Sequence, residues 1–379
     1  MSDSLLIGIA GPLTGKAAGL GKEMKQAAEL AMEECNMAGG VLGRTVGVEV
    51  ADDEGDVGRG ENVARKFGER PELLGVVGHY NSDVTITASA IYRQYDLPVI
   101  SPIASNPMLT ERGFTHVFRL TNRDDHTAAA IAQYLRHTMQ KQRAVVVETN
   151  TMYGKSMAQN FANAFADLGG NILVRHMVEE GQAAFNELVD SLPRNFDLLF
   201  YGGTFEGAPL LRTMRSYGLN QLFVGGDGCW DVNNFLKPAG EAATLGEGVL
   251  VLSATPEVGA VSGSREFARN YERKFGPIFN YAVNSYDAAH LVFAAIEHAA
   301  TESGHIPTRT QVIAAVCALK YQGVAYHRPH EWDEKGDNLA AVTALHVIEG
   351  NRYRQIAESP RGNTEFSRSI LANVTSLSG

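Results

Sequence analysis

Hydroxyl side chains follow two apolar runs of the sequence, at points where short β-strands are expected to end. The segments Gly78–Ser82 and Ser101–Ser105 each carry serine or asparagine and lead toward a helical stretch. Free backbone amides at the start of a helix, together with a neighbouring hydroxyl, form a site suited to a carboxylate. Serine and asparagine at these positions are equally typical of simple helix caps. The two segments are therefore candidates for an anion site.

A carboxylate later in the chain is suited to a cation rather than an anion. The apolar run 222–224 is followed by two glycines, Asp227 and a third glycine, which places an acid directly after an expected strand. Such an acid is well placed to meet an ammonium group, although Asp-Gly is also a common turn. An anion site and an acid together would recognise both charges of a zwitterion.

Patterns for nucleotide binding and hydrolysis are incomplete. Within Gly11–Lys22 the spacing from Gly11 to Gly15-Lys16 is one residue short of a phosphate loop, and no serine or threonine follows either lysine. No Gly-x-Gly-x-x-Gly follows the first strand, and the chain has no Gly-x-Ser-x-Gly elbow. We therefore expect no catalytic residue, no cofactor and no enzyme activity. This expectation also excludes an NAD-dependent oxidoreductase.

The histidines and cysteines do not form a convincing metal site. Pro329 excludes the helical spacing that would bring His327 and His330 together, so a solvated turn is expected there. The three cysteines, Cys35, Cys229 and Cys317, are widely spaced and odd in number. They indicate neither a zinc site nor a disulfide framework, and no metal is expected.

Length and charge narrow the class of protein. At 379 residues the chain suits two domains rather than one. Lysine and arginine total 33 against 43 aspartates and glutamates, a net charge of −10. This balance disfavours nucleic acid and an anionic membrane surface as partners. No apolar stretch approaches the roughly 20 residues of a membrane span.

The elements that must position these residues alternate between strand and helix. Strands are expected at 5–10, 46–51, 73–78, 99–102, 144–148, 172–178, 198–202 and 222–224. Helices are expected near 20–38, 57–69, 82–95, 124–139, 152–168, 184–191 and 206–217. Regular alternation predicts an α/β protein with parallel sheets covered by helices on both faces. The last third differs, with helices near 264–275, 284–300 and 308–319 before two antiparallel-looking strands at 342–349 and 353–357.

Nine short motifs, in this order and spacing, carry a family resemblance. They are Ile7–Gly15, Asn36–Gly43, Asp52-Asp53, Val77–His79, Pro102–Ser105, Leu109–Gly113, Tyr153-Gly154, Tyr201–Gly203 and Trp332–Asp337. With them the sequence resembles the type I periplasmic binding proteins, in the leucine/isoleucine/valine-binding branch that serves ABC transporters. The resemblance covers about residues 5 to 357.

The resemblance implies two doubly wound, Rossmann-like lobes joined by a three-crossover hinge that closes on a ligand. Lobe 1 would hold 1–122 and 254–331, and lobe 2 would hold 123–253 and 332–379. The protein would be an extracytoplasmic receptor, a monomer that captures a small amino acid and delivers it to the membrane permease of an ABC transporter.

The resemblance also implies a set of ligand-binding residues. Carboxylate contacts fall on Ser82 and on the loop of Ile103, Ala104 and Ser105. Tyr153 would reach over the ligand, and Asp227 would pair the ammonium. Positions facing the ligand's side chain are Leu20, Tyr80, Thr204, Tyr281 and Trp230, with Cys229 nearby.

Four positions depart from the branched-chain pattern. The family has tyrosines where this chain has Leu20 and Thr204, and a disulfide where it has Gly55 and Asn81. The headgroup residues therefore look intact while the side-chain pocket is rebuilt. The expected ligand is a branched-chain or related apolar or aromatic amino acid.

Two alternatives keep the same fold. Residues 1–10 lack the basic and apolar pattern of an export leader, so either a leader was removed and the protein is periplasmic, or it is a cytosolic amide or amino-acid sensor. A binder of aromatic carboxylic acids is the other alternative, although Asp227 would then face an unpaired anion.

Overall fold

The computed structural model describes residues 5–278 and 281–368 and divides the chain into two compact units. Unit 1 comprises Met1–Asn122 and Val258–Ala341, and unit 2 comprises Arg123–Glu257 and Val342–Gly379. Residues 1–4, 279–280 and 369–379 lie outside the described part. The chain passes from one unit to the other three times.

The structure moves the two later boundaries of the expected lobes from 253 to 257 and from 331 to 341. Glu257 belongs with unit 2 because its amide donates to Gln355 Oε1 at 2.8 Å. The segment after residue 331 belongs with unit 1 because Asp337 forms a buried ion pair with Arg119. Long-range contacts of this kind have no local signal in the sequence.

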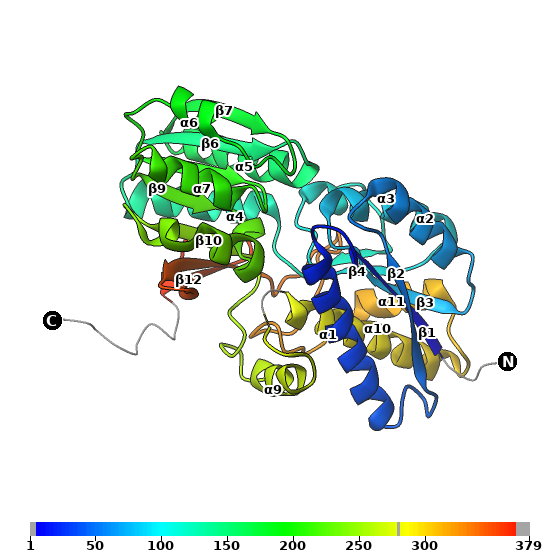
Figure 1. Ribbon diagram of the computed structural model, residues 1–379. Coiled ribbons are helices and arrows are strands. Elements are labelled where there is room, and N and C mark those ends of the chain that lie inside the picture. The colour runs from blue at the N-terminus through cyan, green and yellow to red at the C-terminus, as the bar shows by residue number, and fades with distance from the viewer. Residues whose placement is uncertain (1–4, 279–280, 369–379) are drawn as a thin grey trace. The chain divides into compact units, whose positions relative to one another are not determined.

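Unit 1 is built on one fully parallel five-stranded sheet, with strand order β2-β1-β3-β4-β5 (Figure 1). Its strands are β1 (Leu5–Gly11), β2 (Val46–Asp52), β3 (Leu73–Gly78), β4 (Val99–Ser101) and β5 (Val117–Arg119). β1, β3 and β4 are mostly aliphatic and buried, as expected for strands that are covered on both faces, whereas the edge strand β2 is mostly half-buried.

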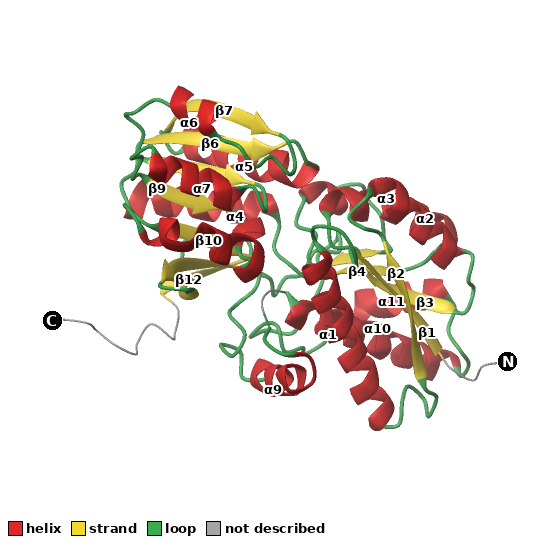
Figure 2. Cartoon of the chain, viewed as in Figure 1, coloured by secondary structure: helices red, strands yellow, loops and turns green. Residues whose placement is uncertain are grey.

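Two helical layers cover this sheet. The helices are α1 (Ala18–Met37), α2 (Val57–Gly68), α3 (Ser82–Tyr92), α9 (Ser264–Phe275), α10 (Ala282–Ser303) and α11 (Arg309–Ala318). α10 packs against α1 and α11 in one layer, and α2 packs against α3 in the other (Figure 2). Phe67 of α2 fills the core beneath β1, where a side chain in place of Gly8 would overlap its ring.

Unit 2 contains an eight-stranded mixed sheet, with order β13-β12-β11-β10-β9-β8-β6-β7. Its strands are β6 (Arg143–Thr149), β7 (Asn171–Val178), β8 (Leu198–Gly202), β9 (Leu222–Gly225), β10 (Val249–Ser253), β11 (Val342–Glu349), β12 (Arg352–Pro360) and β13 (Ser367–Arg368). β6 to β10 are parallel, and β11 to β13 continue the sheet antiparallel.

The helices of unit 2 alternate with its parallel strands along the chain. They are α4 (Asp124–Gln133), α5 (Met152–Asp167), α6 (Asn186–Ser191), α7 (Gly207–Ser216) and α8 (Lys237–Ala239). α5 packs on α4 and on β6 and β8, and the rings of Phe161 and Phe200 stack 3.8 Å apart at this contact. The expected α/β class is confirmed, with a parallel sheet in unit 1 and, in unit 2, five parallel strands extended by the antiparallel strands at the end of the chain.

None of the helices among residues 5–278 and 281–368 is both long enough and apolar enough to cross a membrane. In both units, the loops that follow neighbouring parallel strands emerge at one edge of the sheet, which is where open α/β sheets bind ligands.

Candidate functional site

Three neighbouring strands of unit 1 place most of its predicted ligand residues at one sheet edge. β1, β3 and β4 are adjacent. The segment after β1 leads to Leu20 in α1, the loop after β3 carries Tyr80 and leads to Ser82, and the loop after β4 carries Ile103, Ala104 and Ser105. The structure brings these residues to a common edge. Leu20 is buried and Tyr80 is half-buried.

Ser82 is the first residue of α3 and is 4% exposed. The preceding residue, Asn81, makes no side-chain capping hydrogen bond to the helix. The first-turn amides of α3 are therefore not satisfied by this cap, and within the described residues the Ser82 hydroxyl has no hydrogen-bond partner either. A carboxylate would find both kinds of donor here.

A buried hydrogen-bonded relay of Asp53, His79 and Tyr92 holds the loop in front of Ser82, and the sequence analysis missed it. His79 Nδ1 lies 2.6 Å from Asp53 Oδ2, and its Nε2 lies 2.9 Å from the hydroxyl of Tyr92. All three side chains are fully buried. Burial, and then the nearby Asp53 carboxylate, raise the pKa of Tyr92 well above its usual value. The motifs Asp52-Asp53 and Val77–His79 were the only signal for this relay.

The loop after β4 turns its carbonyl groups toward the protein interior. Thr121 Oγ1 donates to Ile103 O at 3.1 Å, and Arg119 Nη1 donates to Asn106 O at 2.6 Å. The amide of Ala104 donates to Ser101 Oγ at 3.2 Å. Within the described part of the chain, the amide and the hydroxyl of Ser105 have no partner. Ser105 thus keeps two donors for a ligand.

Tyr281 comes from a distant part of the sequence and immediately precedes α10. It is buried, and α10 packs against β3 and β4. Asn284, in the first turn of α10, donates to Pro102 O at 3.2 Å. This contact brings the start of α10 beside the loop that carries Ile103 to Ser105.

Three neighbouring strands of unit 2 hold the remaining predicted residues. β6, β8 and β9 are adjacent. Tyr153 lies in the first turn of α5 after β6, Thr204 follows β8, and Asp227 and Trp230 follow β9. Thr151 caps α5 by accepting the Gly154 amide at 3.0 Å, which fixes the helix start that carries Tyr153.

Tyr153 and Asp227 are in direct contact. The Tyr153 hydroxyl donates to Asp227 Oδ1 at 2.7 Å and accepts from the Gly228 amide at 2.8 Å. A Cβ added to Gly226 would lie 2.8 Å from the Tyr153 hydroxyl oxygen, and one added to Gly228 would lie 2.5 Å from Gly203 O. Glycines flank the acid because the tyrosine and the neighbouring loop approach the backbone this closely.

The surroundings of Asp227 are acidic. Burial raises the pKa of Tyr153 well above its usual value, and the Asp227 and Asp124 carboxylates add to the effect. Burial likewise raises the pKa of the Cys229 thiol, and the negative charges of Glu206, Asp227 and Asp231 raise it further. A concentration of negative charge of this kind favours a cation.

The residues before and after Trp230 are both hydrogen-bonded to Tyr353. The Tyr353 hydroxyl donates to Cys229 O at 2.6 Å and accepts from the Asp231 amide at 3.2 Å. The Trp230 ring stacks on His346, with centroids 5.6 Å apart. His346 and Tyr353 lie on β11 and β12, and no local pattern in the sequence connects them with Trp230.

Thr204 contacts a buried acid that the sequence analysis also missed. Its hydroxyl lies 3.4 Å from Glu206 Oε2, which also accepts from Tyr201 Oη at 3.0 Å. The Gly181 amide donates to the other oxygen of Glu206 at 2.5 Å. Glu206 therefore joins the loops that follow β7 and β8.

The structure corrects the interpretation of the segment 327–330 as a solvated turn. His327 is exposed, but His330 is fully buried and its Nε2 lies 2.9 Å from Asp287 Oδ2. Its Nδ1 lies 3.0 Å from Asn338 Nδ2. Among the described residues no group of three or more histidines, cysteines or acids could hold a metal ion, and all three cysteines are unpaired.

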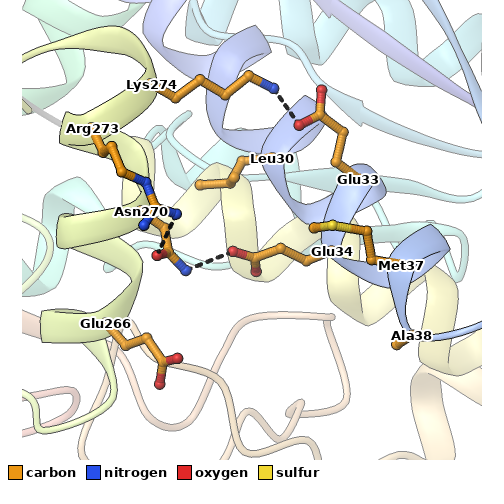
Figure 3. A pocket seen from close by; sticks show the side chains of 9 residues that line it. All are labelled: Leu30, Glu33, Glu34, Met37, Ala38, Glu266, Asn270, Arg273 and Lys274. Carbon is orange, nitrogen blue, oxygen red and sulfur yellow. Dashed lines mark hydrogen bonds and ion pairs between the residues drawn. The ribbon is translucent and has the colours of Figure 1, made fainter.

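A hollow of about 700 Å³ lies between the second half of α1 and α9 of unit 1 (Figure 3). Leu30 and exposed Met37 line it, and Glu34 accepts from Asn270 Nδ2 at 2.9 Å across it. It contains none of the predicted ligand residues. Lys274 pairs with Glu33, and Arg273 bonds to Asn270 Oδ1; we do not take this hollow as the candidate site.

Similarity to known proteins agrees with this geometry. A family model described as Periplasmic binding protein matches residues 4–351. The Leu/Ile/Val-binding protein homolog 1 of Brucella abortus (strain 2308) is 33% identical over 240 residues, which make up 63% of this chain and 64% of that relative. The match thus spans less than two thirds of that relative's length.

Two further proteins are similar over more of the chain. The Leu/Ile/Val-binding protein BraC3 of Rhizobium johnstonii (strain DSM 114642 / LMG 32736 / 3841) is 30% identical over 297 residues, 78% of this chain and 79% of the relative. An ABC transporter substrate-binding protein from Desulfitobacterium hafniense, solved in complex with Leu, is 28% identical with a TM-score of 0.78, covering 93% of this chain and 99% of that one. The chain belongs to the periplasmic binding protein family, as the sequence motifs indicated.

Proposed function

We propose that the protein is a solute-binding receptor that captures one small amino acid. In this proposal the amides and hydroxyls at Ser82 and Ser105 of unit 1 bind the carboxylate, and Asp227 of unit 2 binds the ammonium. The observation that supports the proposal is the contrast between the predicted ligand residues of unit 1 and those of unit 2. Unit 1 offers hydrogen-bond donors at the start of a helix and in a loop, and unit 2 offers carboxylates.

Desolvation makes this contrast a requirement for binding. Removing a charged group from water costs several kcal/mol unless an opposite charge or several hydrogen bonds replace the water. A zwitterion has two such groups, so a site with only one kind of partner would leave the other charge unpaired. Tyr153, which donates to Asp227 Oδ1 at 2.7 Å, orients the acid.

The remaining predicted residues favour an apolar ligand side chain. Leu20, Tyr281 and Trp230 are buried, while Tyr80 and Thr204 are half-buried. Large aromatic surfaces bind apolar groups by removing them from water. We therefore propose a branched-chain or related apolar or aromatic amino acid as the ligand, in line with the names of the relatives.

The family points to the wider role. We propose that the receptor works outside the cytoplasm as a monomer, delivers its ligand to the membrane permease of an ABC transporter, and catalyses no reaction. Ligand capture would proceed by closure of the two units, which is a shift of a pre-existing equilibrium toward the ligand-bound state. A cytosolic sensor with the same site would bind the same amino acids without a permease.

A thermal-shift panel of amino acids, their amides and aromatic acids tests the class of ligand. A ligand that binds only the folded state raises the melting temperature, by an amount that grows with its concentration above Kd. We expect the largest shifts from leucine, isoleucine, valine or phenylalanine. A shift from benzoate with none from any amino acid would instead favour the carboxylic-acid binder.

Substitution of the acid tests the mode of binding. Asp227→Ala should weaken amino-acid binding by about 2–5 kcal/mol, because the ammonium is then buried without a partner. Asp190→Ala is a matched control, because Asp190 is an exposed acid of the same unit. Equal affinities of wild type and Asp227→Ala in calorimetry would remove Asp227 from the site.

A further inference from the structure

Behind the proposed carboxylate loop lies a guanidinium that is completely removed from solvent. Arg119, at the end of β5, is 0% exposed, and its partner Asp337 is 1% exposed. The Nε and Nη2 atoms of Arg119 donate to Asp337 Oδ1 at 2.8 and 2.5 Å. A buried ion pair of this kind adds little net stability over apolar residues of similar size, so its presence calls for another explanation.

The other donors of Arg119 all point to one stretch of chain. Nη1 donates to Asn106 O at 2.6 Å and, more weakly, to Ala104 O at 3.5 Å, while Nη2 donates to Thr110 Oγ1 at 2.7 Å. With the two bonds to Asp337, all five N–H groups of the guanidinium have acceptors. Two of these acceptors are carbonyl groups on either side of Ser105.

These contacts determine which side of the loop faces inward. A peptide unit directs its carbonyl and its amide to opposite sides. With the carbonyls of Ala104 and Asn106 held by Arg119, and that of Ile103 held by Thr121, the loop cannot turn over without breaking several buried hydrogen bonds. Ser105 keeps its amide and hydroxyl unpartnered among the described residues as a consequence.

We propose that Arg119, held by Asp337, is a positioning residue for carboxylate recognition: it fixes the Ile103–Ser105 loop so that the Ser105 donors are presented to the ligand. This inference rests on the proposed function. Arg119 does not touch the ligand. Its role is to keep the loop in the one conformation in which the carboxylate exchanges water for protein donors without rearrangement.

A role in positioning differs from a role in folding in what it does to different ligands. Loss of the loop conformation affects ligands that have a carboxylate and leaves ligands that lack one almost unchanged. Leucine, its amide and 4-methylpentanoate separate these cases, because the amide lacks the carboxylate and 4-methylpentanoate lacks the ammonium. Phenylalanine, its amide and 3-phenylpropanoate form a second set with a larger side chain.

The experiment uses calorimetry and thermal shift on the full chain with both ligand sets. In Arg119→Met/Asp337→Leu, which removes both buried charges together, the affinity for leucine and 4-methylpentanoate should fall 10- to 100-fold. The affinity for leucinamide should stay within threefold. The backbone bridge in which the Arg119 amide donates to Gly336 O at 2.9 Å is independent of both side chains, which favours a folded variant.

Arg119→Lys is a second variant in case the double variant does not fold. A lysine keeps the charge but has three donors on a single nitrogen, too few for the five bonds that Arg119 makes. We expect at least a tenfold loss for leucine with leucinamide again unchanged. Arg59→Met is the control. Arg59 belongs to the same unit and its side chain is 58% exposed, so this substitution should leave all affinities unchanged.

The Asp227→Asn variant gives the opposite pattern and serves as the reference for the ammonium side. There, leucine and leucinamide should weaken together while 4-methylpentanoate does not. Equal losses for leucine and leucinamide in folded Arg119 variants would overturn the positioning role, as would leucine binding within threefold of wild type. Failure of the wild type to bind any amino acid would instead overturn the proposed function and, with it, this inference.

Discussion

Trp230 depends on neighbours from strands more than a hundred residues away in sequence. Its indole stacks on the imidazole of His346, and the two loop residues beside it bond to the Tyr353 hydroxyl. Neither nitrogen of His346 makes a hydrogen bond of normal geometry with the described residues. His346 therefore acts as a flat, uncharged support, and a proton on it would be costly.

The protonation of His346 leads to a prediction of pH-dependent stability. Burial lowers the pKa of His346 from 6.5 to about 4. The unfolded chain binds this proton below about pH 6.5, and the folded protein binds it only below about pH 4. The contribution of neutral His346 to the free energy of unfolding is therefore fully present above pH 6.5 and is lost as the pH falls from 6.5 to 4. A shift of this size corresponds to about 3 kcal/mol.

His346→Phe should remove this part of the pH dependence. The aromatic ring is kept while the titrating group is removed, so the free energy of unfolding from urea titrations should fall less steeply than in wild type between pH 6.5 and 4. Because other buried histidines also have lowered pKa values, only the difference between the two proteins is diagnostic. His327→Gln, at an exposed position, is the control. Parallel pH profiles for wild type and His346→Phe would contradict the prediction.

The sequence predicted the site residues unevenly. Ser82, Ser105 and Asp227 stood out because they follow expected strands, and Ser105 also belongs to one of the nine motifs; the structure places all three after strands. Arg119, Glu206 and His346 were missed. Arg119 and His346 act through partners that are distant along the chain, Asp337 and Trp230, and Glu206 also binds the distant Gly181 amide, so no local pattern indicates these contacts.

At the scale of the element, α1 shows how one helix start depends on its glycines. Gly19 and Gly21 both lie in its first turn, on either side of Leu20. A Cβ on Gly19 would meet nothing within 4 Å, whereas a Cβ on Gly21 would lie 2.0 Å from the carbonyl oxygen of Pro12. The same substitution at these two positions therefore has opposite consequences.

Gly19→Ala should be neutral or stabilise the protein by about 0.5 kcal/mol, because alanine costs less backbone entropy than glycine in a helix. Gly21→Ala should destabilise it by about 1–3 kcal/mol, since the helix start must move away from the loop after β1. It should also weaken ligand binding, because Leu20 moves with the helix. Thermal unfolding of the two variants gives the comparison, and similar melting temperatures would show that the loop gives way without cost.

Most elements followed from the alternation of apolar runs with helical periodicity. The expected strands at 5–10, 73–78 and 198–202 and the antiparallel pair after residue 341 are present, each within a few residues of its expected ends. β5 (Val117–Arg119) was missed because three residues carry no periodicity and one of them is a buried arginine. β10 (Val249–Ser253) begins with a plain apolar run of four residues, which periodicity alone cannot assign.

At the scale of the whole molecule, each unit has its own sheet and its own apolar core. The proposed function requires one ligand that engages residues of both units. A zwitterion does so in our account, since its two charges require the two different sets of partners. The chain's net charge of −10 cannot supply this coupling, because screening by salt limits its reach to about 10 Å.

Calorimetric titration of the wild type with leucine, leucinamide and 4-methylpentanoate tests this account most directly. If one ligand engages both sets of residues, leucine binds with a stoichiometry of one per chain. The two truncated ligands then bind at least 100-fold more weakly, because each leaves one set of partners unused. Binding of 4-methylpentanoate as tightly as leucine, or two leucines bound per chain, would contradict it.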